Sequence, residues 1–191
     1  MKFNVMIAAV AALAMLCTVN LTAQSKMTGK TVTVGGEAMY PKKNIVENAV
    51  NSADHTTLVA AVKAAGLVET LQGAGPFTVF APVNNAFEDL PEGTVETLLK
   101  PENKKTLTTV LTYHVVAGNY DYDAIAAAIK KGKGKATLKT VSGGTLTAMM
   151  NGARNIAVAD ESGNVANIST YDVTQSNGVI HVVDQVLLPK M

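Results

Sequence analysis

The chain has 191 residues, with 16 Lys and Arg against 15 Asp and Glu, so its formal net charge is +1. A nearly neutral chain lacks the strongly basic face that follows nucleic-acid phosphates, which argues against nucleic-acid binding. A hydrophobic share of 48% and a low net charge exclude a mostly disordered chain. The length suits one domain that buries a substantial core.

The first 23 residues have the features of a secretory signal peptide. Lys2 supplies the positive start, and an apolar run from Val5 to Cys17 follows it. This run is shorter than the ~20 residues needed to span a bilayer, so we predict cleavage after Ala23 and export, not membrane insertion. Lipidation of Cys17 is the alternative, although no small residue directly precedes it. If Cys17 is removed with the signal, the mature chain has no cysteine, and disulfides and thiol catalysis are excluded. The destination stays open between periplasm, cell surface and medium.

Residues 24–43 contain few apolar side chains, so burial offsets little of their chain entropy. We predict a linker or loosely attached arm here, in which 31–34 could form an edge strand. The single folded domain is predicted to span residues 44–190.

Apolar residues recur mainly at helical spacing from Asn44 to residue 131. This spacing predicts helices over 44–50, 54–65, 84–90, 95–99, 101–111 and 124–131, with a short helical turn near 67–71. Asp54 and Asn84 stand where side chains cap the helices that follow them. Two segments have strand character instead, at 77–80 and 113–116.

After Ala136 the pattern changes to short β-rich runs separated by Gly-containing turns, at spacings of about ten residues. The last run covers 179–183. Helices in the front half followed by strands in the back half predict an α+β fold, not an alternating doubly wound sheet.

The inventory of chemical groups is sparse. The three histidines are His55, His114 and His181, and no HExxH motif or i, i+4 histidine pair indicates a zinc site. His114 and His181 lie in apolar runs typical of buried neutral imidazoles, whereas His55 is expected to be a solvated residue at a helix start. A small hydrolase using His114, His181 and Asp184 is the enzymatic alternative, but no G-x-S-x-G motif accompanies them. We therefore expect no catalytic residues, no metal and no cofactor.

One charge cluster stands out at the end of the Ala-rich helix over 124–131. It consists of Lys130, Lys131, Lys133 and Lys135, and Tyr120 and Tyr122 precede the same helix. The helix macrodipole favours cations at this end, so a solvated helix terminus explains the lysines. The alternative is a surface patch whose cationic and aromatic side chains contact an acidic glycan or surface.

Two distant segments resemble the signatures of fasciclin domains. The first is FTVFAPVNNAF over residues 77–87, and the second is NGVIHVVDQVLLP over residues 177–189. Tyr113-His114 between them matches the Tyr–His motif of the family, and the order and spacing fit one copy over about 44–189. The resemblance implies an α+β fold in which a β-sandwich-like wedge of two sheets carries helices around it. It also implies a secreted or surface-attached adhesion module that is not an enzyme.

Most residues of these signatures are predicted to have structural roles, and they are Phe77, Phe80, Asn84, Asn177, Gly178, His181 and Asp184. The strand over 77–80 is expected to pair with 179–183, and Asn177-Gly178 to supply a positive-φ turn before the last strand. Asp184 is expected to accept backbone N–H groups near residues 81–85 or to pair with a histidine.

The resemblance marks Tyr113 and His114 as candidate adhesion residues. The function predicted is an exported, non-enzymatic binding or adhesion module that contacts an extracellular or envelope glycan or protein. Self-association into a matrix is the alternative, because a neutral chain lacks long-range repulsion between copies. The sequence leaves the ligand and the oligomeric state open.

Overall fold

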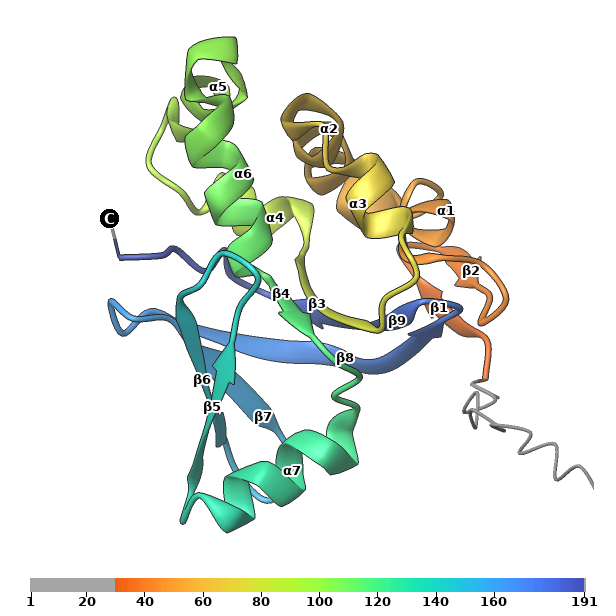
Figure 1. Ribbon diagram of the computed structural model, residues 1–191, viewed down its shortest axis with the longest axis vertical. Coiled ribbons are helices and arrows are strands. Elements are labelled where there is room, and N and C mark those ends of the chain that lie inside the picture. The colour runs from red at the N-terminus through yellow and green to blue at the C-terminus, as the bar shows by residue number, and fades with distance from the viewer. Residues whose placement is uncertain (1–29, 191) are drawn as a thin grey trace, which may run out of the picture.

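A computed structural model describes residues 30–190, so the predicted signal peptide and Cys17 lie outside the described residues (Figure 1). Helices pack beside a mixed sheet, which confirms the predicted α+β class. The helices are α1 (Ile45–Ala49), α2 (Thr56–Ala65), α3 (Val68–Gln72), α4 (Asn84–Glu88), α5 (Thr94–Leu99), α6 (Lys104–Tyr113) and α7 (Tyr122–Lys131), with short 3-10 turns at Ala53–His55 and Pro101–Asn103. The strands are β1 (Val32–Val34), β2 (Glu37–Met39), β3 (Phe77–Pro82), β4 (Val115–Ala117), β5 (Lys135–Lys139), β6 (Thr145–Met150), β7 (Ile156–Ala159), β8 (Val165–Gln175) and β9 (Gly178–Val183).

Seven strands form one sheet in the order β4-β3-β9-β8-β7-β6-β5. The two signature segments lie side by side in it, because β3 pairs with β9 in parallel from Phe77 opposite Gly178 to Pro82 opposite Val183. This register confirms the predicted pairing of two segments that are about a hundred residues apart in the chain. Apart from Phe77, the side chains of both strands are buried, as expected for strands covered on both faces.

The long strand β8 joins the two halves of the sheet. It pairs with β9 on one side and with β7 on the other, and its register with β9 shifts between Ile168 and Val173. Such irregularities bend a strand and increase its twist. At the far end Thr140 bridges to Val116 of β4, so the sheet curls until its two edges approach each other. The two sheets expected from the resemblance are therefore halves of one sheet that share β8.

Two main hydrophobic cores result from this curvature. One lies between the sheet and α1, α2, α3 and α6, on the upper side of Figure 1, and contains Leu58, Leu111 and Ile180. The other fills the inside of the curled sheet, is covered by α7, and contains Phe80 and Tyr113. The strand β3 serves both cores because successive side chains point to opposite faces.

Strands β1 and β2 form a hairpin within the segment that the sequence assigned to a loosely attached arm. Val34 and Met39 are buried in the core on the helix side. Only one residue of each three-residue strand is fully buried, and a signal this short does not stand out in the sequence.

Tyr113 and His114 occupy the end of a helix, where the sequence predicted a strand. Tyr113 is the last residue of α6, and β4 begins at Val115. Leu107, Val110 and Leu111 form the buried apolar face of α6, and Tyr113 continues this face into the core. An aromatic residue can therefore end a helix here, although its type is more frequent in strands.

Asn84 caps a helix, but not the one that follows it in the chain. Its Oδ1 accepts the Thr57 N–H at 3.1 Å and the Thr56 hydroxyl at 3.2 Å, and its Nδ2 donates to the Ala53 carbonyl at 2.8 Å. Asn84 therefore caps α2 from a distant segment, and Asp54, expected to cap this helix, makes no capping bond. The tertiary fold brings the amide to this helix end.

Replacing Asn84 with alanine is expected to lower the free energy of unfolding by about 1–2 kcal/mol, because two α2 donors and one carbonyl lose their partner. Urea denaturation followed by circular dichroism measures the change. Asn85→Ala is the matched control, since Asn85 is exposed on the same short helix. Equal stabilities for N84A and N85A would contradict this role.

Candidate functional site

Tyr113 is fully buried, at 0% exposure, between the end of α6 and the curled sheet. Its hydroxyl donates to the Thr145 carbonyl at 2.7 Å and accepts the Glu161 N–H at 3.1 Å. Burial raises the pKa of the phenol, so the hydroxyl stays protonated as this donor. Gly144 packs on its ring, because a Cβ there would lie 2.7 Å from a ring carbon. Tyr113 thus ties α6 to β6 and to the turn after β7.

His114 is 3% exposed and uses both ring nitrogens inside the protein. Nε2 accepts the Leu187 N–H at 2.9 Å, which fixes the proton on Nδ1, and Nδ1 donates to the Val110 carbonyl at 2.8 Å. Burial lowers its pKa to about 4. The resemblance marked Tyr113 and His114 as candidate adhesion residues; here both side chains are buried, and their polar atoms form hydrogen bonds within the protein.

His181 is also buried and neutral. Its Nε2–H donates to the Tyr120 carbonyl at 2.7 Å, while its ring stacks on Phe80 with 5.7 Å between centroids. Burial lowers its pKa as well. His114 and His181 thus match the prediction of buried imidazoles with internal hydrogen bonds.

His55 departs from its prediction as a solvated residue, since it is 2% exposed. The 3-10 turn before α2 places its ring inside, where Nδ1 is 2.9 Å from the Ser52 hydroxyl. The burial of His55 could not be predicted, because a single residue beside a capping position shows no sequence pattern that tells whether its side chain points inward or outward.

Asp184 binds a different partner from those predicted. Its carboxylate accepts the Asn167 N–H at 2.7 Å and the Asn167 side-chain amide at 2.9 Å, which fastens the end of β9 to β8. It contacts neither the backbone of 81–85 nor a histidine by hydrogen bond. The three residues of the hydrolase alternative, His114, His181 and Asp184, are therefore each engaged with a separate partner. Within residues 30–190, no group of three or more His, Cys, Asp or Glu side chains could hold a metal ion.

Asn177 and Gly178 both matter to the fold, but not through a positive-φ turn, because neither has a positive φ. The Asn177 side chain accepts the Ile45 N–H at 3.0 Å and donates to the carbonyls of Leu71 and Gly73 at 2.8 and 2.9 Å. A Cβ on Gly178 would lie 2.0 Å from the Phe77 carbonyl oxygen, so glycine is required by the close approach of β3.

Tyr120 and Tyr122 are half-buried and pack on the core inside the curled sheet. The Tyr122 ring meets the Tyr171 ring edge-on, with 5.3 Å between centroids. These two tyrosines cover the core beside the start of α7, whereas the lysines lie at its other end. The structure therefore separates the aromatic and the cationic parts of the predicted patch.

The four lysines of the patch are all exposed, around the end of α7 and the start of β5. The turn over residues 151–155 lies at the same end of the sheet, because Met149 pairs with Lys135 and Met150 with Ile156. This turn carries exposed Arg154, which sequence spacing alone did not connect to the cluster. We call the set of Lys130, Lys131, Lys133, Lys135 and Arg154 the basic tip.

Acidic residues are absent from this part of the chain. Residues 124–159 contain no Asp or Glu, but they contain the basic tip and Lys139. The nearly neutral chain thus has a locally positive end, in the lower part of Figure 1, away from the helices above the sheet. A positive region of this size attracts anionic groups, within a Debye length of about 8 Å at physiological salt.

No helix in the described range 30–190 is long and apolar enough to cross a membrane.

Comparisons with known proteins agree on one family. The sequence profile of the Fasciclin domain matches residues 53–189. Protein sll1483 of Synechocystis sp. is 45% identical over 171 residues, which are 88% of this chain and 86% of that protein. The cell surface glycolipoprotein MPB83 of Mycobacterium bovis is 36% identical over 123 residues, which are 64% of this chain and 48% of that protein.

The structure is similar to that of a FAS1 domain pair from the insect cell adhesion molecule Fasciclin I. The TM-score is 0.67 at 18% identity, over 76% of this chain and 51% of that one. This likeness concerns the fold. Together with the profile match and the paired signature strands β3 and β9, it establishes that the chain belongs to the fasciclin domain family.

Proposed function

We propose that this protein is an exported, non-enzymatic adhesion module that binds an acidic glycan of the cell envelope or matrix through the basic tip. The observation that carries the proposal is this group of exposed cations, in a stretch of the chain without Asp or Glu, in a protein whose net charge is only +1. An acidic surface of another protein would satisfy the same charges and is an outcome that the test separates. Family membership and relatives such as a cell surface glycolipoprotein support a role outside the cytoplasm.

The shape of the tip suits an extended anionic chain. Its cations come from the last turn of α7, the following turn, the start of β5 and the β6–β7 turn, so they surround one corner of the domain. The turn after α7 is tightly built, because a Cβ on Gly132 would lie 1.9 Å from the Lys135 carbonyl oxygen. This constraint holds the two groups of lysines close together on a firm support. A repeating polyanion can contact several of them at once.

Replacing Lys130, Lys131, Lys133 and Lys135 with glutamine is expected to weaken binding to a sulfated or uronate polysaccharide about tenfold or more. Exposed ion pairs contribute little each, so four are removed together. Retention on heparin–agarose and on immobilised alginate, with the salt concentration needed for elution, measures the loss. Wild-type binding should weaken steeply with salt, since the contacts are exposed charges.

The control variant replaces Lys42, Lys100, Lys104 and Lys105, which are exposed elsewhere, and changes the net charge by the same amount. It should elute with the wild type. If both variants bound the polysaccharide equally more weakly, net charge alone would determine binding. This result would contradict a binding site at the basic tip. Failure of the wild type to bind either polysaccharide, with retention of an acidic protein ligand, would replace the glycan by a protein partner.

A further inference from the structure

Asparagine is followed by glycine at two positions in the chain, Asn151-Gly152 at the basic tip and Asn177-Gly178 before β9. In such a pair the side-chain amide reacts readily with the next backbone nitrogen, because glycine has no Cβ to hinder the approach. The chemistry of the two pairs is the same. Their surroundings in the fold therefore decide which of them reacts.

The first pair lies open to solvent in the β6–β7 turn. The Asn151 N–H donates to the Asn155 carbonyl at 2.7 Å, which closes the hairpin and leaves the three residues after Asn151 as its loop. Every residue of this turn is exposed, and a Cβ built on Gly152 would have no atom within 4 Å. Among the described residues the Gly152 N–H has no hydrogen-bond partner. The nitrogen that would attack is thus exposed, unpaired and unhindered.

A single contact holds the Asn151 side chain. Its Nδ2 donates to Asn167 Oδ1 at 2.8 Å, and both residues are exposed. Water can replace a hydrogen bond at such a place with little loss of stability. The Asn151 amide can therefore leave Asn167 and rotate toward the Gly152 nitrogen without a disturbance of the core.

The second pair is fixed in the interior. Three hydrogen bonds hold the Asn177 side chain to backbone groups at the start of α1 and at the end of α3. Asn177 is 7% exposed, and a Cβ on Gly178 would lie 2.0 Å from the Phe77 carbonyl oxygen. The amide cannot turn, and the backbone beside it has no room for a ring.

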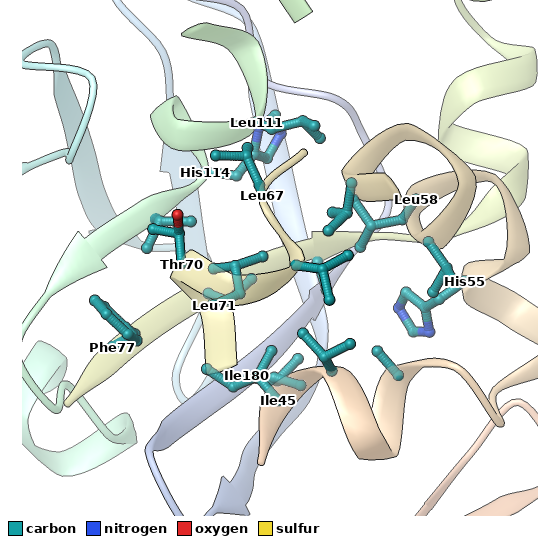
Figure 2. A pocket seen from close by; sticks show the side chains of 18 of the residues that line it. Ile45, His55, Leu58, Leu67, Thr70, Leu71, Phe77, Leu111, His114 and Ile180 are labelled. Carbon is teal, nitrogen blue, oxygen red and sulfur yellow. The ribbon is translucent and has the colours of Figure 1, made fainter. Parts of the chain in front are cut away.

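An apolar pocket of about 270 Å³ adjoins this buried pair (Figure 2). Figure 2 shows Ile45, Leu71 and Phe77 among its lining residues. Ile45 and Leu71 bind the Asn177 side chain through their backbone groups, and the Phe77 carbonyl lies against Gly178. A void with an apolar lining does not hold ordered water. Asn177 therefore also lacks the water that the reaction consumes.

The charges of the basic tip favour the reaction at Asn151. Arg154 lies three positions after Asn151, and Lys135 pairs opposite Met149, two positions before it. No Asp or Glu occurs in residues 124–159. The attacking nitrogen becomes negative as it loses its proton, and cations nearby stabilise that charge. They also stabilise the carboxylate that the reaction leaves behind.

We propose that Asn151-Gly152 is a site of spontaneous deamidation, which turns an amide in the basic tip into a carboxylate. The Gly152 nitrogen forms a bond to Asn151 Cγ, and Nδ2 leaves as ammonia, which gives a cyclic imide. Water then adds to one of the two ring carbonyls and opens the ring to aspartate or isoaspartate. The sequence of steps consumes one water, releases one ammonia and needs no other reactant.

The modification lowers the positive charge of the basic tip by one unit. A carboxylate among these exposed cations opposes the attraction of polyanions, so the protein binds them more weakly as it ages. This consequence rests on the proposed function. The modification itself does not, because it depends only on the turn.

The test follows the mass of peptides from the purified mature protein during incubation at mildly alkaline pH. Trypsin releases residues 140–154, in which Asn151 is the one side-chain amide, so a gain of one mass unit reports its deamidation. Fragmentation of the peptide 155–190 reports Asn177. In the folded protein Asn151 is expected to react at least about tenfold faster than Asn177, because the buried pair must first open locally. In urea the two pairs should react at similar rates.

Asn151→Gln is the control for the assignment, because its longer side chain would have to close a larger and less favourable ring. The peptide 140–154 of N151Q should keep its mass over the same period. An Asn151 that stays intact in the folded protein, or that reacts no faster than Asn177, would overturn the proposal. A gain of mass in N151Q at the wild-type rate would overturn it as well.

A second measurement addresses the effect on binding. Asn151→Asp reproduces one product, and Asn119→Asp makes the same change of charge in the exposed loop before α7. N151D is expected to elute from heparin–agarose at lower salt than N119D, because only the first places a carboxylate in the basic tip. Elution of both variants at the same salt would overturn this effect. If the wild type is not retained by any polysaccharide, the proposed function fails, and the peptide masses still decide the modification.

Discussion

Lowering the pH from 7 to 4 is expected to reduce the free energy of unfolding by about 3 kcal/mol through His114 alone. Burial holds the pKa of this imidazole at about 4, against an ordinary value of 6.5. The side chain is 3% exposed and Nε2 already accepts the Leu187 N–H, so a proton on Nε2 would break that bond. The folded protein therefore excludes the proton that the unfolded chain takes up.

The sign follows from proton counts. Between pH 6.5 and 4 the unfolded chain binds more protons at this position than the folded chain, so stability falls as the pH falls. The full contribution is present above 6.5, and the loss levels off below about 4. His55 and His181 add to it in the same direction, because burial lowers their pKa values too.

Urea denaturation at several pH values between 7.5 and 4, followed by circular dichroism, measures the slope. His114→Gln should be less stable at pH 7, because one side chain end cannot serve both Val110 and Leu187. Its stability should also fall less between pH 6.5 and 4. Parallel pH profiles for the wild type and H114Q would contradict the burial of a neutral imidazole.

Replacing Asn177 with alanine is expected to destabilise the fold by about 3–5 kcal/mol, a large part of the stability of a small domain. Its side chain joins the first residue of α1 to the end of α3 and to the residue that follows it, at the point where β9 begins. Without it, the Ile45 N–H and the carbonyls of Leu71 and Gly73 lose a partner in a mostly buried place. The Asn177 carbonyl also accepts the Phe77 N–H at 3.0 Å, and this bond remains.

Thermal and urea unfolding of N177A measure the loss, and Asn119→Ala in an exposed loop is the matched control. Asn177→Asp separates the bonds, because a carboxylate still accepts the Ile45 N–H but repels the two carbonyls. We expect N177D to be at least as unstable as N177A. If N177A were as stable as N119A, water would replace the hydrogen bonds of the Asn177 amide. This result would contradict the role of Asn177 in joining the three segments.

Sequence patterns that repeat along the chain proved sufficient for much of the fold. The period of 3.6 residues located α2, α6 and α7, and alternation with Gly turns located the strands after residue 136, because both signals come from many residues that share one face. The pairing of β3 with β9 came from the fasciclin resemblance and the β-rich character of both segments, and their register confirms it. The four lysines of the tip were visible because they are consecutive or nearly so.

Polar contacts between residues far apart in the chain could not be predicted from these periodic patterns. Asn84 caps α2 from another segment, Asp184 binds Asn167, and Arg154 joins the lysines through a hairpin register. Each depends on where two distant backbones lie in space, which a local pattern does not encode.

The sequence by itself determined the α+β class, the family and the composition of the basic cluster, because hydrophobic periodicity, signature segments and charge are properties of neighbouring residues. The tertiary structure alone decided that Tyr113 and His114 are sealed inside, that Asn177 links three segments, and that His55 is buried beside an apolar pocket. These depend on packing between segments far apart in the chain, where a rotation of one helix decides whether a ring meets water, another side chain or a cavity.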